Sequence, residues 1–211
     1  PGWWLNEGGQ SASGALLDHV IRLHAAGAGL GERPHERILD RIAELRPAEG
    51  AGFATGLHVL PDFHGNRSPL ADPHARGVVS GLTLDHSFDS LCRLYYRTAV
   101  AIALGTRHIL DALNARGYAI DTLHVAGGHV KNPLLMELYA DATGCDVVVP
   151  AEEDAVLLGS AIVAATAAGL HADLGRAAAA MGRDGSLRRP DPAKSAAFGR
   201  DWRVFLRMHE Q

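Results

Sequence analysis

A strand, a glycine turn and the start of a helix follow one another in Leu123-His124-Val125-Ala126-Gly127-Gly128-His129-Val130-Lys131-Asn132-Pro133. The apolar residues before the glycines are typical of a short buried strand. Gly127 and Gly128 allow backbone angles that are closed to other residues, and they leave room beside the chain. Asn132 can cap the following helix, and Pro133 suits its first turn, where a missing N–H costs nothing.

Such a turn presents free N–H groups at the carboxyl end of a strand, where open α/β sheets bind ligands. Two glycines before a capped helix are also typical of a tight turn with a purely structural role. The chain contains neither a phosphate-binding loop of the G-x-x-x-x-G-K-[ST] type nor a G-x-G-x-x-G motif. The turn by itself therefore leaves a structural role and a nucleotide site both open.

The composition is that of a globular protein, with 47% hydrophobic and 21% charged residues in a chain of 211. A formal net charge of −4 gives no basic surface for nucleic acid and no polybasic signal for a membrane. Cys92 and Cys145 are far apart, which indicates small buried thiols and a reducing, cytoplasmic setting. The apolar run 155–170 is shorter than the roughly 20 residues of a membrane-spanning helix and predicts a buried helix in close contact with its neighbours.

The chain begins Pro1-Gly2-Trp3-Trp4 without an initiating methionine, so we expect a piece of a longer protein. Residues 3–5 predict the end of a strand. Residues 6–14 form a polar, glycine-rich entry to a helix with an apolar stripe. Glu7 in this entry has two interpretations. It is a charge favoured by the helix dipole, or it accepts hydrogen bonds from a polyol or sugar.

The remaining pattern predicts one α/β domain with a helix-rich carboxyl half. Hydrophobic periodicity predicts a helix over 88–116, which at 1.5 Å per residue is roughly 40 Å long and can serve as the spine of the domain. Further predicted helices cover 34–45, 174–181 and a terminal amphipathic segment with Phe198, Trp202, Phe205 and Leu206. Predicted strands cover 57–60, 78–82 and 146–149, and 183–192 is expected to be a polar connector.

The irregular loop 61–73 combines Asp62 and His64 with apolar anchors. The pair is compatible with a metal site or an acid–base pair, but its spacing is not diagnostic, and a loop whose polar groups satisfy one another is favoured. The other histidines have no H-E-x-x-H or similar spacing. No metal ligands are therefore predicted.

Four segments carry a specific resemblance: residues 4–14 (WLNEGGQSASG), 62–70 (DFHGNRSPL), 126–133 (AGGHVKNP) and 155–161 (AVLLGSA). Together, and in this order, they resemble the carboxyl-terminal domain of the FGGY carbohydrate kinases, most closely the D-ribulokinase branch. The resemblance implies an actin-like ATPase fold (ribonuclease H-like), in which helices flank a mixed sheet. It covers nearly all of residues 1–211.

In this family ATP, with Mg²⁺, and the sugar bind in a cleft between two such domains. By position, the resemblance implies that Gly127, Gly128 and Asn132 belong to the loop around the adenosine. Gly14 matches a glycine near the nucleotide, and Asp18 matches a polar position beside it. These five residues form the ATP site that the resemblance predicts.

Glu7 matches a sugar-contacting acid of ribulokinases. The resemblance places the catalytic aspartate and the phosphate-gripping Gly-Thr turn before residue 1, so no catalytic residue is expected in this chain. We expect a nucleotide-binding domain truncated at its start, inactive alone, whose partners are the sugar, ATP and its own amino-terminal domain. A homodimer is a further option, because the long helix and the Trp202 region can face a partner.

The function implied by the resemblance is transfer of the γ-phosphate of ATP to a primary hydroxyl of a ketopentose, with D-ribulose as the first candidate. L-ribulose, xylulose, ribitol and glycerol stay open, because the missing domain reads most of the hydroxyl stereochemistry. A non-catalytic actin-like interaction domain is the alternative from another class. The motifs at Glu7 and at 127–132 argue against it, because a scaffold needs neither.

Overall fold

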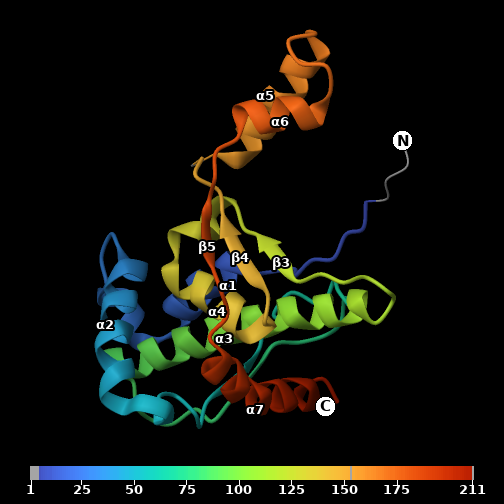
Figure 1. Ribbon diagram of the computed structural model, residues 1–211. Coiled ribbons are helices and arrows are strands. Elements are labelled where there is room, and N and C mark those ends of the chain that lie inside the picture. The colour runs from blue at the N-terminus through green and yellow to red at the C-terminus, as the bar shows by residue number, and fades with distance from the viewer. Residues whose placement is uncertain (1–4, 153, 211) are drawn as a thin grey trace.

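The computed structural model describes residues 5–152 and 154–210 (Figure 1). The strand end expected at 3–5 thus falls almost entirely outside the described residues. The helices are α1 (Gly14–Leu23), α2 (Pro34–Glu49), α3 (Phe88–Asn114), α4 (Pro133–Thr143), α5 (Ala155–Ala167), α6 (Leu174–Met181) and α7 (Pro192–Met208). The strands are β1 (His58–Leu60), β2 (Val78–Ser80), β3 (Thr122–His124), β4 (Asp146–Val149) and β5 (Ser186–Arg188), and short 3₁₀ turns cover Ala25–Gly29, Gly50–Gly52 and Gly127–Lys131.

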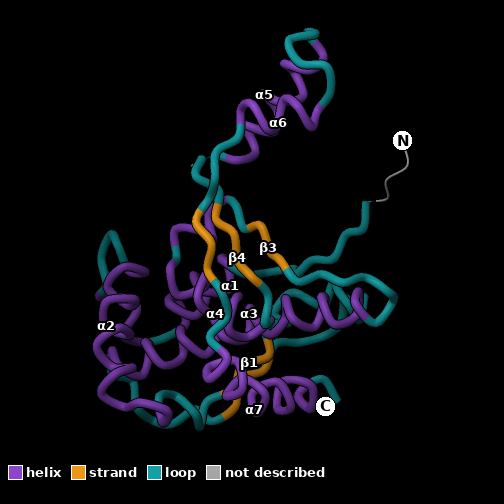
Figure 2. The backbone as a smooth tube through the Cα atoms, in the orientation of Figure 1, coloured by secondary structure: helices purple, strands orange, loops and turns teal. Residues whose placement is uncertain are grey.

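The strands form two small sheets (Figure 2). In the first, β3 runs parallel to β4 with Leu123 opposite Val147, and β5 pairs antiparallel with the other edge of β4. This is the predicted mixed sheet. The second sheet is the antiparallel pair β1–β2. The prediction of a plain connector over 183–192 was wrong, because β5 lies within it. All three residues of β5 are exposed, and a polar–apolar–polar run of three residues is too short to predict a strand.

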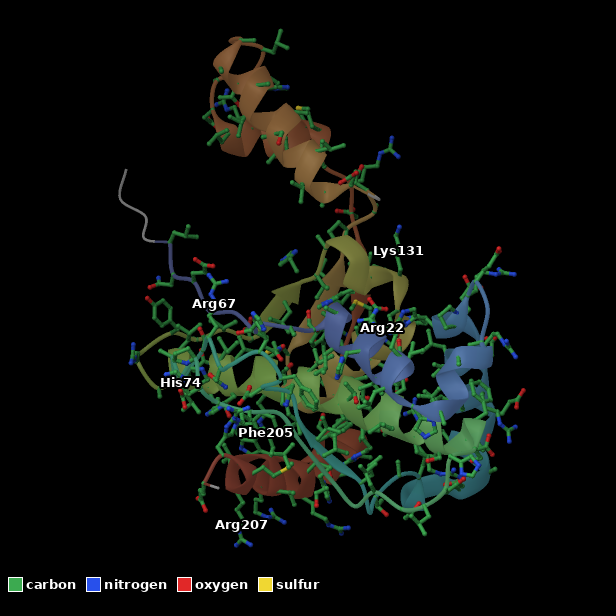
Figure 3. All side chains as sticks on the ribbon, turned by 180° about the vertical axis from the view of Figure 1, so that it is seen from behind. Arg22, Arg67, His74, Lys131, Phe205 and Arg207 are labelled. Atoms are coloured by element: carbon green, nitrogen blue, oxygen red, sulfur yellow. The ribbon has the colours of Figure 1, made fainter. Side chains whose placement is uncertain are left out.

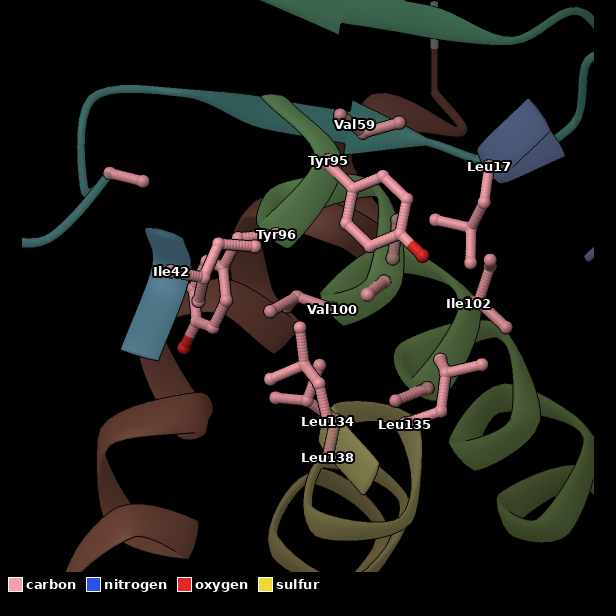
Figure 4. Packing of buried hydrophobic residues seen from close by; sticks show 14 of the residues in the cluster. Leu17, Ile42, Val59, Tyr95, Tyr96, Val100, Ile102, Leu134, Leu135 and Leu138 are labelled. Atoms are coloured by element: carbon pink, nitrogen blue, oxygen red, sulfur yellow. The ribbon is translucent and has the colours of Figure 1, made fainter. Parts of the chain in front are cut away.

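The long helix α3 runs through the centre of the domain and confirms the predicted spine. Ser87 caps it by accepting a hydrogen bond of 3.2 Å from the backbone N–H of Ser90. Helices α1, α2 and α4 pack around it, and their leucines and isoleucines close the core together with Tyr95 and Tyr96 (Figure 4). Burying each large aliphatic side chain stabilises the fold by about 1.5–3 kcal/mol.

Both cysteines are free and buried, as predicted. Burial raises the pKa of the Cys92 thiol to about 12, so it stays protonated. Neither thiol is placed to react.

The run 155–170 was predicted to be a buried helix; the helix was predicted correctly, but its burial was not. The helix α5 is present, but none of its described residues is buried, and Val156 and Leu157 are 72% and 65% exposed. Helices α5 and α6 pack on each other and project away from the rest of the domain (Figure 1). An apolar composition favours burial of a helix, but it does not specify which surface covers the helix.

Among the residues that the structure describes, no helix is long and apolar enough to cross a membrane.

Candidate functional site

The bend after β3 has the predicted geometry. Gly127 adopts φ of +78°, a left-handed angle that favours glycine, and the chain then makes one 3₁₀ turn to Lys131. The side-chain oxygen of Asn132 accepts hydrogen bonds from the backbone N–H groups of Leu134 (3.1 Å) and Leu135 (3.2 Å), and so caps α4. The turn and the cap are both confirmed.

The space beside this bend is open. Apart from its chain neighbours, a Cβ atom added at Gly127, Gly128 or Gly14 would meet no heavy atom within 4 Å. Gly127 and Gly128 are both exposed. A flat ligand could therefore lie directly against the peptide backbone there, without side chains in between.

A chain of hydrogen bonds joins α1 to the bend. The carboxylate of Asp18 lies 2.8 Å from Nε2 of His35 on α2, and Nδ1 of His35 lies 2.9 Å from the hydroxyl of Tyr95 on α3. The side-chain amide of Asn132 donates to the same Tyr95 hydroxyl at 3.1 Å. Two residues predicted for the nucleotide site, Asp18 and Asn132, thus form the two ends of one network.

A second set of hydrogen bonds holds the start of α1 against the same bend. His129 lies 3.0 Å through Nε2 from the hydroxyl of Ser13, the residue before Gly14. Its Nδ1 lies 3.0 Å from the hydroxyl of Tyr139 on α4. Burial lowers the pKa of His129, so the ring is neutral at pH 7. The structure therefore brings Gly14 and the glycine bend to one place.

Glu7 lies in a different part of the molecule. It is mostly exposed and forms an ion pair with Arg67 of the loop 62–70. The backbone N–H of Gly9 donates to the hydroxyl of Ser68 at 3.2 Å and ties the same two segments together. Figure 3 shows Arg67 well apart from Lys131, which follows the glycine bend. The candidate sugar contact and the candidate ATP site are thus separate surfaces of this chain.

The loop 62–70 satisfies its own polar groups, as one of the two interpretations of Asp62 proposed. The buried carboxylate of Asp62 accepts hydrogen bonds from the Asn66 side chain, 3.1 Å to each oxygen, and lies 3.4 Å from Nδ1 of His209. Burial raises the pKa of Asp62. His64 is exposed. Within residues 5–152 and 154–210, no group of three potential ligands is placed to hold a metal ion.

A cavity of about 820 Å³ lies away from the bend, between α2, α3, α4 and α7. On its wall the carboxylate of Glu137 accepts hydrogen bonds from Arg46 (2.7 Å) and Lys194 (3.0 Å). Burial alone would raise the pKa of Glu137, but these hydrogen bonds outweigh it and hold the pKa at about 2.

Replacing Glu137 by glutamine is expected to destabilise the chain at neutral pH by about 3 kcal/mol, because its pKa falls by more than two units on folding. A carboxyl whose pKa is lower in the folded state stabilises the fold above its unfolded pKa of 4.5 and loses this effect as the pH falls towards 2. Urea denaturation at pH 7 and pH 3 should therefore give a smaller difference between wild type and variant at the lower pH. A difference independent of pH would contradict this account.

Five polar residues of the two networks were not predicted as site residues: Ser13, His35, Tyr95, His129 and Tyr139. Tyr95 falls in the apolar stripe of the long helix, and His35 lies near the start of a helix without any motif. The one available signal is general: a buried tyrosine hydroxyl needs a hydrogen-bond partner. That rule indicates a partner exists, but not which residue it is.

Comparisons with known proteins identify the family of the chain. Residues 1–168 match the model of the FGGY family of carbohydrate kinases, C-terminal domain. An FGGY carbohydrate kinase domain-containing protein of Danio rerio is 43% identical over the whole chain, which corresponds to 40% of that protein. A D-ribulokinase of Saccharomyces cerevisiae is 36% identical over 79% of this chain and 25% of its own length.

Among solved structures, a xylulose kinase from Rhodospirillum rubrum superimposes with a TM-score of 0.75 at 30% identity, over 96% of this chain and 38% of that one. The chain thus spans between 25% and 40% of the length of these relatives. The actin-like fold predicted from the motifs is confirmed by this likeness. Because the model of the C-terminal domain matches most of this chain, the chain belongs to the FGGY family of carbohydrate kinases and corresponds to that domain.

Proposed function

We propose that this chain is the nucleotide-binding domain of a kinase that transfers the γ-phosphate of ATP to a primary hydroxyl of a ketopentose. The observation that carries the proposal is the open, exposed glycine bend at 127–128, held beside Gly14 at the start of α1. D-ribulose is the first candidate substrate, because the chain is similar to a D-ribulokinase over most of its length. Xylulose is the second, since a xylulose kinase shares its fold at 30% identity.

In this proposal, the adenosine lies against the backbone of Gly127 and Gly128, where no side chain intervenes. The sugar hydroxyl attacks the γ-phosphate in line, a reaction that depends mainly on positioning and on stabilising charge at the transferring group. Mg²⁺ enters as part of the substrate Mg-ATP, because this ion is held mainly by the phosphates of the nucleotide and by water. Closure of two domains would exclude water from the phosphate.

Glu7 is proposed to contact the sugar. Its carboxylate is 71% exposed and is held beside Arg67, so it can accept hydrogen bonds from hydroxyls without moving buried groups. A carboxylate beside a guanidinium suits a polyol, which both donates and accepts hydrogen bonds.

The exposed apolar side of α5 is proposed to pack against an amino-terminal domain of the same protein. The motif 155–161 lies on this helix; its residues Val156 and Leu157, and Val163 just beyond it, are more than half exposed. Contiguous exposed apolar residues of this kind mark a contact surface. The two buried free thiols suit a reducing compartment, and we propose a cytoplasmic location.

A turnover assay tests whether phosphoryl transfer needs the full-length protein. The encoded full-length protein, given Mg-ATP and a panel of D-ribulose, L-ribulose, xylulose, ribitol and glycerol, should phosphorylate a ketopentose. The isolated 211-residue chain should show no turnover with any of them. Robust phosphorylation by the isolated chain would contradict the proposal. Failure of the full-length protein both to bind ATP and to phosphorylate any sugar would favour a non-catalytic interaction domain.

A further inference from the structure

We infer that Asp18 and Asn132 are positioning residues, which act through His35 and Tyr95 to hold the glycine bend in place, and do not themselves grip the nucleotide. The inference rests on the proposed function and deepens it, because it gives roles to His35 and Tyr95, which lie outside the sequence motifs. The direction and completeness of the four-residue network support it.

One assignment of donors and acceptors, with the His35 ring neutral, satisfies every member of the network. An ionised Asp18 can only accept, so Nε2 of His35 donates to it at 2.8 Å. In the neutral ring Nδ1 is then an acceptor, and the Tyr95 hydroxyl donates to it at 2.9 Å. The oxygen of Tyr95 is left to accept the amide N–H of Asn132 at 3.1 Å. Each donor therefore faces an acceptor from α1 to the bend.

The side chain of Asn132 is almost fully used by the protein itself. Its oxygen accepts two backbone N–H groups of α4, and one of its two amide hydrogens points to Tyr95. An amide has two acceptor sites and two donors, so a single N–H is left for a ligand. This suits a residue that fixes the junction between the bend and α4, and it leaves adenosine binding to the bare backbone of 127–128.

Tyr95 connects this junction to the centre of the domain. Its side chain belongs to α3 and is fully buried, whereas the carboxylate of Asp18 at the far end is about half exposed. A buried hydroxyl is costly to leave without a partner, so the arrangement of His35 and Asn132 around it is strongly favoured over alternatives. The bend is thereby oriented relative to the long central helix α3.

The matched pair Tyr95→Phe and Tyr96→Phe tests the inference in the full-length protein. The adjacent Tyr96 is also buried, but its ring lies apart from that of Tyr95, beside Ile42 of α2 (Figure 4). The guanidinium of Arg46 lies 5.3 Å from the centre of the Tyr96 ring, and the Tyr96 hydroxyl makes no hydrogen bond within the described residues. Tyr95→Phe should raise the KM for ATP roughly tenfold, with kcat and the KM for sugar little changed. Tyr96→Phe should leave all three unchanged. Equal effects of the two variants would overturn the inference.

A double-variant cycle separates positioning from direct contact. If Asp18 acts through His35 and Tyr95, Asp18→Ala and Tyr95→Phe should each raise the dissociation constant for ATP by a similar factor. The double variant should then bind ATP with the same dissociation constant as the single variant that binds ATP less tightly. Factors that multiply would overturn the inference and make Asp18 an independent contact. Absence of ATP binding by the wild type would instead defeat the proposed function, and the inference with it.

Discussion

Replacing Gly128 by tryptophan is expected to weaken ATP binding by the full-length protein roughly 100-fold, or about 2.8 kcal/mol. Gly128 is exposed, and a Cβ atom there would meet nothing within 4 Å, so the protein can fold around the larger residue. The indole would occupy the space in which the proposed function places the adenosine. Isothermal titration calorimetry with ATP measures the change directly.

Gly128→Ala is the matched control. A methyl group meets no neighbour at this position, so the alanine variant should bind ATP within a few-fold of wild type. The KM for sugar should stay the same in both variants, because Glu7 and Arg67 lie in another part of the chain. Unchanged ATP affinity in Gly128→Trp would remove the glycine bend from the binding site.

Replacing Asp201 by alanine is expected to destabilise the chain by about 3–5 kcal/mol. Asp201 on α7 accepts two hydrogen bonds, of 2.9 and 2.7 Å, from the guanidinium of Arg97 on α3. The side chain of Arg97 is only 6% exposed, so the variant would leave a buried positive charge without its counterion. The free energy of unfolding, measured by urea denaturation of the 211-residue chain, should fall accordingly.

An exposed ion pair supplies the control for this prediction. Glu36 pairs with Arg33 at 2.9 Å, but the two side chains are 62% and 75% exposed. Glu36→Ala should therefore change the free energy of unfolding by less than about 1 kcal/mol. If Asp201→Ala and Glu36→Ala lowered the free energy of unfolding by comparable amounts, burial of Arg97 would not determine the strength of the Arg97–Asp201 ion pair.

The helices and turns that short-range signals specify were predicted closely. Ser87 caps the long helix, and Asn132 and Pro133 start α4. These signals operate within a few residues along the chain, because a capping side chain bonds to the backbone just after it. The same holds for Gly127, whose left-handed angle is a property of one residue.

Strand pairing and helix burial depend on segments that are distant in the sequence, and short-range patterns did not predict them. Strand β5 exists because it pairs with β4, almost forty residues earlier, and its own three residues are too few to predict a strand. The exposure of α5 was missed for a related reason: its apolar composition predicts burial, but composition does not say whether the rest of this chain covers the helix. The tertiary structure decides which strands pair and which helix faces are buried.

The amino-acid sequence by itself determined the family, the glycine bend and the positions of the candidate site residues, because these follow from motifs and from local backbone chemistry. Only the tertiary structure decided which polar atoms meet around the bend. His35 and Tyr95 lie sixty positions apart in the sequence, yet their side chains come within hydrogen-bond distance when α2 packs on α3. Hydrogen bonds act over about 3 Å, so helix packing, and not spacing along the chain, selects their partners.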